Sequence, residues 1–229
     1  MTKTEIFQIY FEDQQESILD PAFTPLLNTN KDQIKYREWT VLYRSLQIGE
    51  QRDLDIWGFT SWKWSQKIDR PGSDFLKLIA DQPDSACWFM EPVVRENDDI
   101  FDNPWRQGDF CHPGMIKLAQ TIFDRLGYKL NAETDLIPNC FFNYFAMNKA
   151  TWEKYMDTLD RVKQIVDTDP ELSHMMYVKP AEYNFDKSLP YWIFFVERFI
   201  TSFLIAENIP YSTLKYNNSV FINEFIRQR

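Results

Sequence analysis

Apolar residues recur along the chain in two alternating patterns, one typical of strands and one typical of helices. Short runs rich in aromatic and β-branched residues predict strands over residues 6–11, 55–62, 86–90 and 140–147. Apolar positions three and four residues apart predict helices over residues 36–46 and 75–80, from His112 to Leu126, after the cap Asn148, and over residues 191–206. This alternation indicates an α/β fold with a mainly parallel sheet flanked by helices. No repeat or linker divides the chain, so we expect a single domain over residues 1–229.

Residues 168–190 have no clear apolar period and contain three prolines. An irregular segment of this length inside a compact domain typically has a function. We therefore predict a mobile lid here, which closes over a bound substrate and excludes water from it.

Composition narrows the classes of ligand. Aromatic residues make up 17% of the chain, and they fill a core, line a groove suited to the flat faces of sugars, or do both. The six glycines form neither a dinucleotide-binding motif nor a P-loop, which excludes those two kinds of phosphate site. The net charge of −9 argues against nucleic acid as a partner, because its binding needs a basic surface.

Nothing in the sequence predicts export or membrane insertion. The first residues are acidic where a signal peptide is basic and then apolar, and the apolar run over residues 191–206 carries two charges. Cys87, Cys111 and Cys140 are odd in number and far apart, which fits a reducing compartment. We expect a cytoplasmic protein without a transmembrane segment, and a peripheral membrane contact stays open.

Asp53, Asp55 and Glu91 are the candidate metal ligands. Two carboxylates two residues apart can share a divalent cation that also binds a diphosphate. Asp53 and Asp55 precede an apolar run, however, whereas ligands of such sheets bind beyond the carboxyl ends of the strands. Glu91 follows the predicted strand over residues 86–90 and is an alternative ligand or base. The need for a metal, and its identity as Mg²⁺ or Mn²⁺, stay open.

Three titratable or charged residues are candidates for chemistry at a diphosphate. His112 lies at a predicted helix start, where free N–H groups suit a phosphate, and a capping or packing histidine is the alternative. Glu197 and Arg198 are adjacent in an otherwise apolar helix. They form a structural ion pair, or they face a cleft with Arg198 toward phosphate and Glu197 toward an acceptor hydroxyl.

Five segments follow one another along the chain: residues 28–30 with 38–40, 55–63 (DIWGFTSWK), 103–114 (NPWRQGDFCHPG), 143–152 (NYFAMNKATW) and 194–204 (FFVERFITSFL). In this order they resemble segments of bacterial capsule and lipopolysaccharide glycosyltransferases with a GT-A-like fold. The resemblance covers residues 6–208. The chain departs from many such enzymes at one point, since no Asp-x-Asp follows a strand.

The resemblance implies a glycosyltransferase that moves a sugar from a nucleotide-diphosphate donor to a growing surface polysaccharide or glycolipid acceptor. Combined with the positions above, it assigns catalytic roles to Asp55, His112 and Glu197. It assigns donor binding to Glu38, Trp57, Ser61, Lys63, Asn143 and Arg198, with Lys63 offsetting diphosphate charge.

Two other classes of function stay open. One is a non-catalytic carbohydrate- or partner-binding protein on the same fold, and the other, a phosphotransferase, is disfavoured by the absence of a phosphate loop. The positions of six residues distinguish an enzyme from a non-catalytic binding protein. In an enzyme we expect them around one cleft, and in a binding protein we expect them to be scattered: Glu38, Asp55, Lys63, His112, Glu197 and Arg198. The sequence leaves open the donor sugar, the acceptor, the stereochemical outcome and the oligomeric state.

Overall fold

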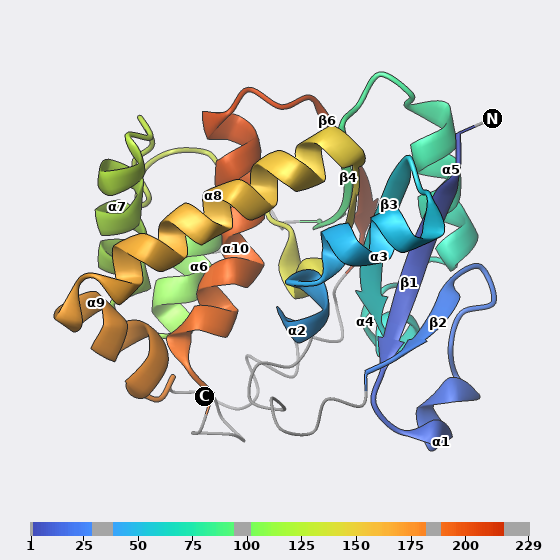
Figure 1. The fold of residues 1–229 in the computed structure, drawn as a ribbon, viewed down its shortest axis with the longest axis horizontal. Helices are drawn as coiled ribbons and strands as arrows, with labels where there is room; N and C mark the ends of the chain where they lie inside the picture. The colour runs from blue at the N-terminus through green and yellow to red at the C-terminus, as the bar shows by residue number, and fades with distance from the viewer. Residues whose placement is uncertain (1, 29–38, 94–101, 182–188, 218–229) are drawn as a thin grey trace.

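The computed structural model describes residues 2–28, 39–93, 102–181 and 189–217. Its strands are β1 (Thr4–Tyr10), β2 (Thr24–Leu27), β3 (Ile56–Ser61), β4 (Cys87–Pro92), β5 (Phe145–Asn148) and β6 (Tyr211–Tyr216). They form a six-stranded sheet in the order β2-β1-β3-β5-β4-β6 (Figure 1). All strands run in one direction except β5, which is antiparallel to both of its neighbours.

Helices flank both faces of this sheet. They are α1 (Asp13–Glu16), α2 (Trp39–Leu42), α3 (Ser45–Arg52), α4 (Trp64–Lys67), α5 (Gly72–Asp81), α6 (Pro104–Cys111), α7 (Met115–Leu126), α8 (Lys149–Asp167), α9 (Pro170–Ser173) and α10 (Tyr191–Ala206), with a 3-10 turn η2 (Phe141–Asn143) and a π-helix η3 (His174–Val178). The predicted α/β class with a mainly parallel sheet flanked by helices is confirmed.

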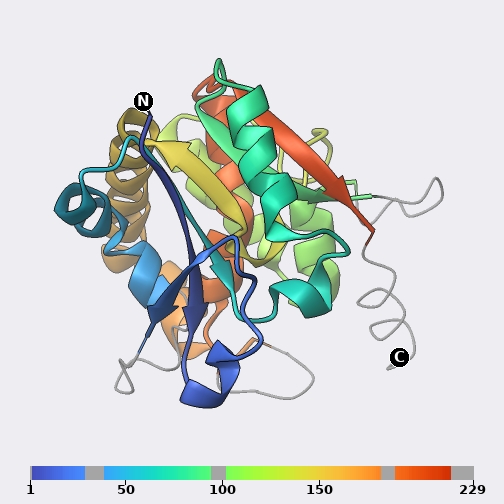
Figure 2. The same ribbon diagram turned by 90° about the vertical axis from the view of Figure 1, so that its right-hand side faces the viewer.

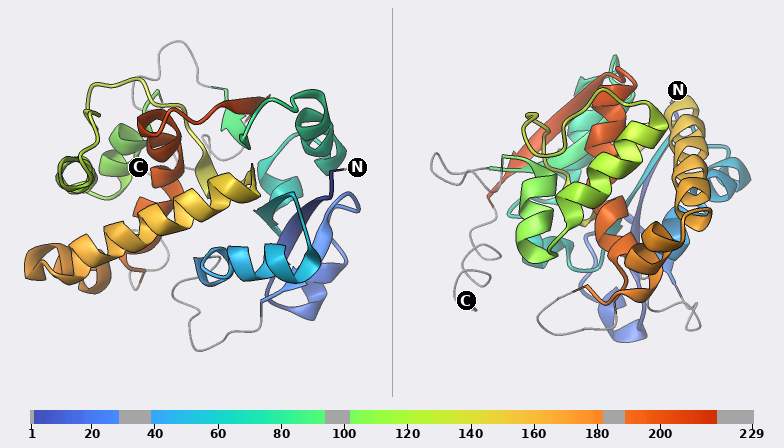
Figure 3. Two further views of the ribbon diagram at one scale, coloured as in Figure 1. Left: turned by 45° about the horizontal axis from the view of Figure 1, so that its top comes forward. Right: turned by 90° about the vertical axis from the view of Figure 1, so that its left-hand side faces the viewer.

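The core consists of two clusters, one on each face of the sheet. Alternate residues of a strand point to opposite faces. Phe7 of β1 and Phe89 of β4 therefore join the cluster under α3, α8 and α10, which α6 and α7 extend on the side away from α5 (Figure 3). Ile6 and Trp88, one residue earlier in each strand, join the cluster under α4 and α5 (Figure 2).

Agreement with the predicted elements is closest where the apolar period is long. The helix over residues 191–206 is α10, and Asn148 caps α8 by accepting a hydrogen bond from the Thr151 N–H at 2.9 Å. The helix predicted over residues 36–46 is instead two helices, α2 and α3, of which residues 36–38 lie outside the described ranges. The sequence did not predict β2, α6 or β6.

The lid prediction is corrected over residues 168–181. This stretch forms α9 and η3, and Leu172 and Met176 are buried in the main core cluster. Asp169 caps α9 by accepting from the N–H groups of Glu171 and Leu172. Buried apolar side chains hold this stretch in place, and residues 182–188 lie outside the described ranges. Within the described ranges, none of the helices has the length and hydropathy to cross a bilayer.

Candidate functional site

The carboxyl ends of β1, β3, β4 and β6 meet at one edge of the sheet, which we call the carboxyl edge. The arrowheads of β1 and β2 point toward it in Figure 1. Because β5 runs in the opposite direction, its first residues lie at this edge as well. Ligands of open α/β sheets bind beyond this edge, which makes it the place to look for a site.

A hydrogen bond joins the end of β3 to the start of β5 at the carboxyl edge. The Ser61 Oγ and Tyr144 Oη atoms are 2.6 Å apart, and both side chains are buried. The Gln8 side-chain amide donates to the Ser61 carbonyl oxygen at 3.0 Å, which ties in β1. The predicted donor-binding residue Ser61 is therefore held by two neighbouring strands.

Asn143, another predicted donor-binding residue, has an uncommon backbone conformation. Phe142 and Asn143 have φ values of 67° and 58°. Side chains other than glycine rarely adopt this left-handed region, and where they do the residue is often functional. The buried side-chain oxygen of Asn143 has no hydrogen-bond partner among the described residues.

The structure brings two predicted residues, Glu91 and Glu197, into one neighbourhood. The Met90 N–H donates to the Tyr144 carbonyl oxygen at 3.0 Å, so Glu91, one residue further along β4, lies beside η2. Glu197 lies on α10, which packs against η2. The pKa of the nearby Cys140 thiol is raised, first by burial and then by Cys87 and by both carboxylates.

Both carboxylates are only partly exposed, each side chain at 19%. The nearest cations are Lys215, 3.8 Å from Glu91, and Arg198, 3.9 Å from Glu197. Neither carboxylate accepts a hydrogen bond from any residue that the structure describes. Their oxygens can therefore accept a proton or a hydroxyl hydrogen from a ligand.

Two lysines follow β3 at the same edge. Lys63 is partly buried, with its Nζ 5.0 Å from the Trp62 ring centre. The Lys67 Nζ lies 3.6 Å from the centre of the ring of Phe142, the residue that precedes Asn143 in the sequence. These cations provide local positive charge for an anionic ligand in a protein of net charge −9.

Asp53 and Asp55 lie at the opposite edge of the sheet. Asp55 accepts from the Lys3 backbone N–H at 2.8 Å, and Asp53 accepts from the Lys3 ammonium at 2.6 Å. At about 3.3 Å per residue, β3 separates Asp55 from Ser61 by about 20 Å. This placement corrects the expectation that Asp55 lies beside Ser61 and Lys63.

No group of three or more potential metal ligands occurs within the described part of the chain. Asp53 and Asp55 bind Lys3, and Glu91 is paired with Lys215. Glu38, predicted to bind the donor, lies outside the described residues. The three predicted metal ligands, Asp53, Asp55 and Glu91, therefore do not come together to form a cation site.

Trp57, predicted to bind the donor, lies in the core. Its side chain is fully buried, and its ring stacks on Trp152 with the centres 5.9 Å apart. A Cβ atom on Gly49 would lie 2.5 Å from the Trp57 ring, so α3 packs directly on it. This ring has no face open to a donor.

His112 is a packing histidine rather than a phosphate ligand. It ends α6 and lies 3.9 Å, centre to centre, from the Phe194 ring. Burial, followed by the charge of Arg198, lowers its pKa from 6.5 to about 3, so the ring is neutral at pH 7. The N–H groups at the start of α7 are occupied as well, because Asp109 accepts from those of Gly114 and Ile116.

Arg198 is buried between α10 and α6, at 3% exposure. Its Nε–H donates to the Pro104 carbonyl oxygen at 3.1 Å and to the Gln107 side-chain oxygen at 3.2 Å. Its Nη1 donates to the Phe194 carbonyl oxygen at 2.8 Å. These partners hold the buried guanidinium within the fold, which corrects its predicted contact with donor phosphates.

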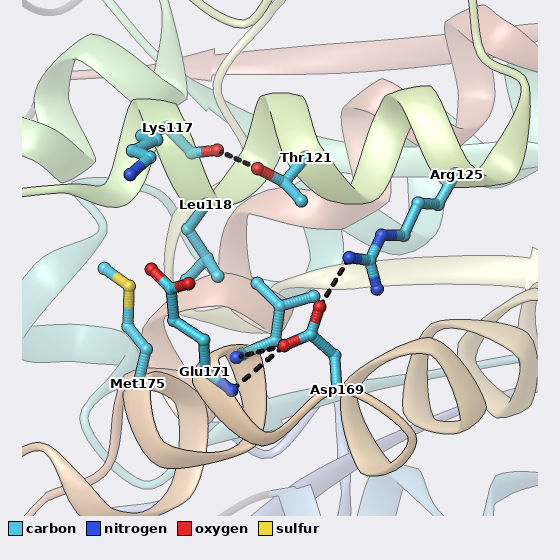
Figure 4. A pocket seen from close by; sticks show the side chains of 8 residues that line it. Lys117, Leu118, Thr121, Arg125, Asp169, Glu171 and Met175 are labelled. Carbon is cyan, nitrogen blue, oxygen red and sulfur yellow. Dashed lines mark hydrogen bonds and ion pairs between the residues drawn. The ribbon is translucent and has the colours of Figure 1, made fainter.

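A small pocket of about 160 Å³ lies away from the sheet, between α7 and α9. Figure 4 shows Lys117, Thr121 and Arg125 of α7 facing Asp169 and Glu171. Arg125 pairs with Asp169 at 2.5 Å across it. Ligand sites are typically 300 Å³ or larger, so this pocket does not compete with the carboxyl edge.

Sequence reasoning missed three residues of the carboxyl edge: Tyr144, Lys215 and Tyr216. Tyr144 adjoins the predicted Asn143. Lys215 and Tyr216 belong to β6, whose partners in β4 are Glu91 and Pro92. The β-rich composition of residues 211–216 (YSTLKY) was the available signal.

No protein-family model matches the chain, and no curated protein matches it. A solved structure does: the apo form of WbbM, a bifunctional glycosyltransferase, is similar over 96% of this chain with a TM-score of 0.59 and 13% identity. The chain spans 46% of the length of that structure. At this identity the likeness shows the fold alone, so the chain has a glycosyltransferase-like fold.

We predict that His112 makes stability fall in acid. The folded pKa of about 3 lies below the unfolded value of 6.5, so the unfolded chain binds the proton first. The part of the free energy of unfolding that depends on neutral His112 is fully present above pH 6.5. It is lost as the pH falls from 6.5 toward 3, at up to about 1.4 kcal/mol per pH unit. Urea unfolding of His112→Gln at several pH values should show a shallower slope over this range. His174→Gln, at an exposed position, should keep the wild-type slope, and an unchanged slope in His112→Gln would contradict the assignment.

We predict that Arg198→Ala lowers the free energy of unfolding by about 3 kcal/mol, because it removes several hydrogen bonds from a buried cation. The matched control is Arg125→Ala. The Arg125 side chain is 41% exposed, and its ion pair with Asp169 contributes less than about 1 kcal/mol to the free energy of unfolding. Urea unfolding measures both variants. Equal stability of the two would show that Arg198 is not structural.

Proposed function

We propose that residues 1–229 form a single glycosyltransferase domain that transfers a sugar from a nucleotide-diphosphate donor to a saccharide or glycolipid acceptor. The observation that carries the proposal is the carboxyl edge itself. There, two partly buried carboxylates that accept no hydrogen bond from a described residue lie on the β4 side, and two lysines lie on the β3 side. The glycosyltransferase-like fold supports the same reading.

Sugar transfer breaks the bond between the sugar and the diphosphate and joins the sugar to an acceptor oxygen. The acceptor hydroxyl loses its proton, and a carboxylate without a hydrogen-bond partner can take it. We assign this base role to Glu197, with Glu91 as the alternative. Lys63 offsets the charge of the departing diphosphate, a role that the buried His112 and Arg198 are not placed to fill.

Further features complete the proposal. A GT-A-type enzyme that builds capsule or lipopolysaccharide sugars would act in the cytoplasm, where nucleotide-sugars are made, and could meet a glycolipid acceptor at the membrane surface. The three free cysteines fit that compartment. Mg²⁺ and Mn²⁺ enter the experiments as variables, because the described residues assemble no cluster of metal ligands.

A non-catalytic carbohydrate-binding protein is the second candidate. The observation that favours it is the scatter of the predicted catalytic and donor-binding residues, since Asp55 lies at the far edge and His112 and Arg198 are buried. Such a protein would bind a saccharide without releasing a nucleoside diphosphate from any donor. Turnover therefore separates the two candidates.

We predict that one nucleoside diphosphate stabilises the chain in a thermal-shift screen of UDP, GDP, CDP and dTDP, each with and without Mg²⁺ or Mn²⁺. At 100 times its dissociation constant, the ligand should add about 2.7 kcal/mol. Lys63→Ala should reduce this gain, whereas Lys117→Ala, in the pocket beside α7, should retain it. If none of the nucleotides shifts the transition, the donor proposal fails.

We predict that Glu197→Gln lowers kcat at least about a hundredfold, because an amide cannot take the acceptor proton. Release of nucleoside diphosphate from the donor found in the screen measures turnover. Glu153→Gln, exposed on α8, is the control and should retain full activity. A folded Glu197→Gln enzyme with full turnover would contradict the role, and a loss confined to Glu91→Gln would transfer it to Glu91.

A further inference from the structure

Two lysines lie one helical turn apart at α4, the short helix that follows β3 at the carboxyl edge (Figure 1). Lys63 directly precedes α4 and Lys67 ends it, and the Lys67 backbone N–H donates to the Lys63 carbonyl oxygen at 3.1 Å. Residues four apart in a helix lie on the same side, with Cβ atoms about 5–6 Å apart, and like charges there repel each other. An anion bound by both lysines would offset this repulsion.

Each of the two lysines lies against an aromatic ring. The Lys63 Nζ is 5.0 Å from the centre of the Trp62 ring, and the Lys67 Nζ is 3.6 Å from the centre of the Phe142 ring. The face of a ring attracts a cation but, unlike a carboxylate, carries no net charge that would cancel it. Both lysine side chains are partly buried, so water screens their attraction for an anion less than it would at a fully exposed position.

The Phe142 ring belongs to a closed chain of contacts with α4. It lies 5.6 Å, centre to centre, from the Tyr144 ring, which lies 5.4 Å from the ring of Trp64 on α4. The Tyr144 hydroxyl is held in turn by its 2.6 Å hydrogen bond with the Ser61 hydroxyl at the end of β3. Trp64 and Tyr144 are fully buried in the cluster under α4 and α5, and Phe142 packs against that cluster. These contacts fix the ring relative to the helix that carries Lys67.

The backbone of Phe142 is strained, with a φ of 67°. Bulky side chains rarely adopt this left-handed region, and residues that are held in it gather at functional sites. A glycine would make the same turn without strain, but it has no ring to place beneath a cation. An unfavourable backbone conformation is therefore retained at the residue whose ring contacts Lys67.

We propose that Lys63 and Lys67 together bind the diphosphate of the donor, and that Phe142 is a positioning residue that holds Lys67 for this contact. The inference rests on the proposed function, to which it adds Lys67 and Phe142. A diphosphate has two adjacent phosphoryl groups, so each group can contact one of two cations that lie a helical turn apart. A monophosphate has a single phosphoryl group and gains less from the second cation. The two lysines therefore discriminate diphosphates from monophosphates.

The test is isothermal titration calorimetry of the purified chain with four pairs of nucleotides: UDP and UMP, GDP and GMP, CDP and CMP, and dTDP and dTMP. At least one diphosphate should bind about tenfold more tightly than its monophosphate. Lys67→Met keeps the aliphatic part of the side chain over the ring and removes the charge. It should weaken the diphosphate about tenfold, as expected for one lost charge-assisted hydrogen bond, and the monophosphate about twofold or less. Lys67→Arg keeps the charge and should remain within about threefold of the wild type.

Phe142→Leu tests the positioning role, because it removes the ring and keeps an apolar side chain. It should weaken the diphosphate about threefold, as expected for a lost cation–π contact. The double variant Lys67→Met/Phe142→Leu should bind no more weakly than Lys67→Met alone, since Phe142 acts through Lys67. A merely structural role would add the same loss in both backgrounds. If Phe142→Leu does not fold, Phe142→Met takes its place in this comparison.

Lys77→Ala is the matched control. This lysine of α5 is 71% exposed and forms an ion pair with Asp81, so its loss should leave the affinity for the diphosphate unchanged. Circular dichroism and thermal unfolding check that each variant is folded before it is titrated.

Three outcomes overturn the inference while the proposed function stands. The diphosphate binds no more tightly than its monophosphate, Lys67→Met weakens both equally or neither, or the loss in Phe142→Leu persists undiminished in the double variant. In each case a nucleoside diphosphate still binds, so only the assignment of Lys67 or of Phe142 is wrong. If none of the nucleotides binds, the inference and the donor proposal fail together.

Discussion

The burial of the Arg198 guanidinium between α10 and α6 is the contact on which the candidate site depends. A buried cation is stable only when its hydrogen bonds are made, and α6 supplies two of the acceptors through Pro104 and Gln107. This requirement fixes the rotation of α10 about its axis. Successive helical residues point about 100° apart. Glu197, the residue before Arg198, therefore points in a different direction about the axis of α10, a helix that packs against η2.

A second constraint is the reversed direction of β5. Because β5 is antiparallel, the residues before it, rather than those after it, lie at the carboxyl edge. Gly58 lets β3 and β5 approach closely, since a Cβ atom there would lie 2.3 Å from the Phe145 carbonyl oxygen. The left-handed backbone of Phe142 and Asn143 then turns the chain into the strand.

The sequence was sufficient for elements with a long apolar period, such as α10, and for the cap at Asn148. It was insufficient where a residue's environment comes from distant segments. His112 follows a helix that the local pattern did not predict, and its ring packs on Phe194, far along the chain. Asp55 precedes β3, and this position alone places it at the edge opposite the carboxyl edge. Its position relative to the strand was a simpler signal than the similarity of residues 55–63 to a glycosyltransferase segment. Tyr216 lies at the carboxyl edge only because β6 pairs with β4, and no local pattern gives that register.

The order of the strands separates two kinds of polar group at the carboxyl edge. Lys63 follows β3, whereas Glu91 lies on β4, and β5 stands between these two strands. A nucleotide-sugar has the same polarity, with an anionic diphosphate joined to a sugar that is rich in hydroxyl groups. A diphosphate held near Lys63 would direct its sugar across the start of β5, past Asn143, toward Glu91 and Glu197. A donor bound in the opposite sense would place the diphosphate against two carboxylates, so electrostatic repulsion favours one orientation.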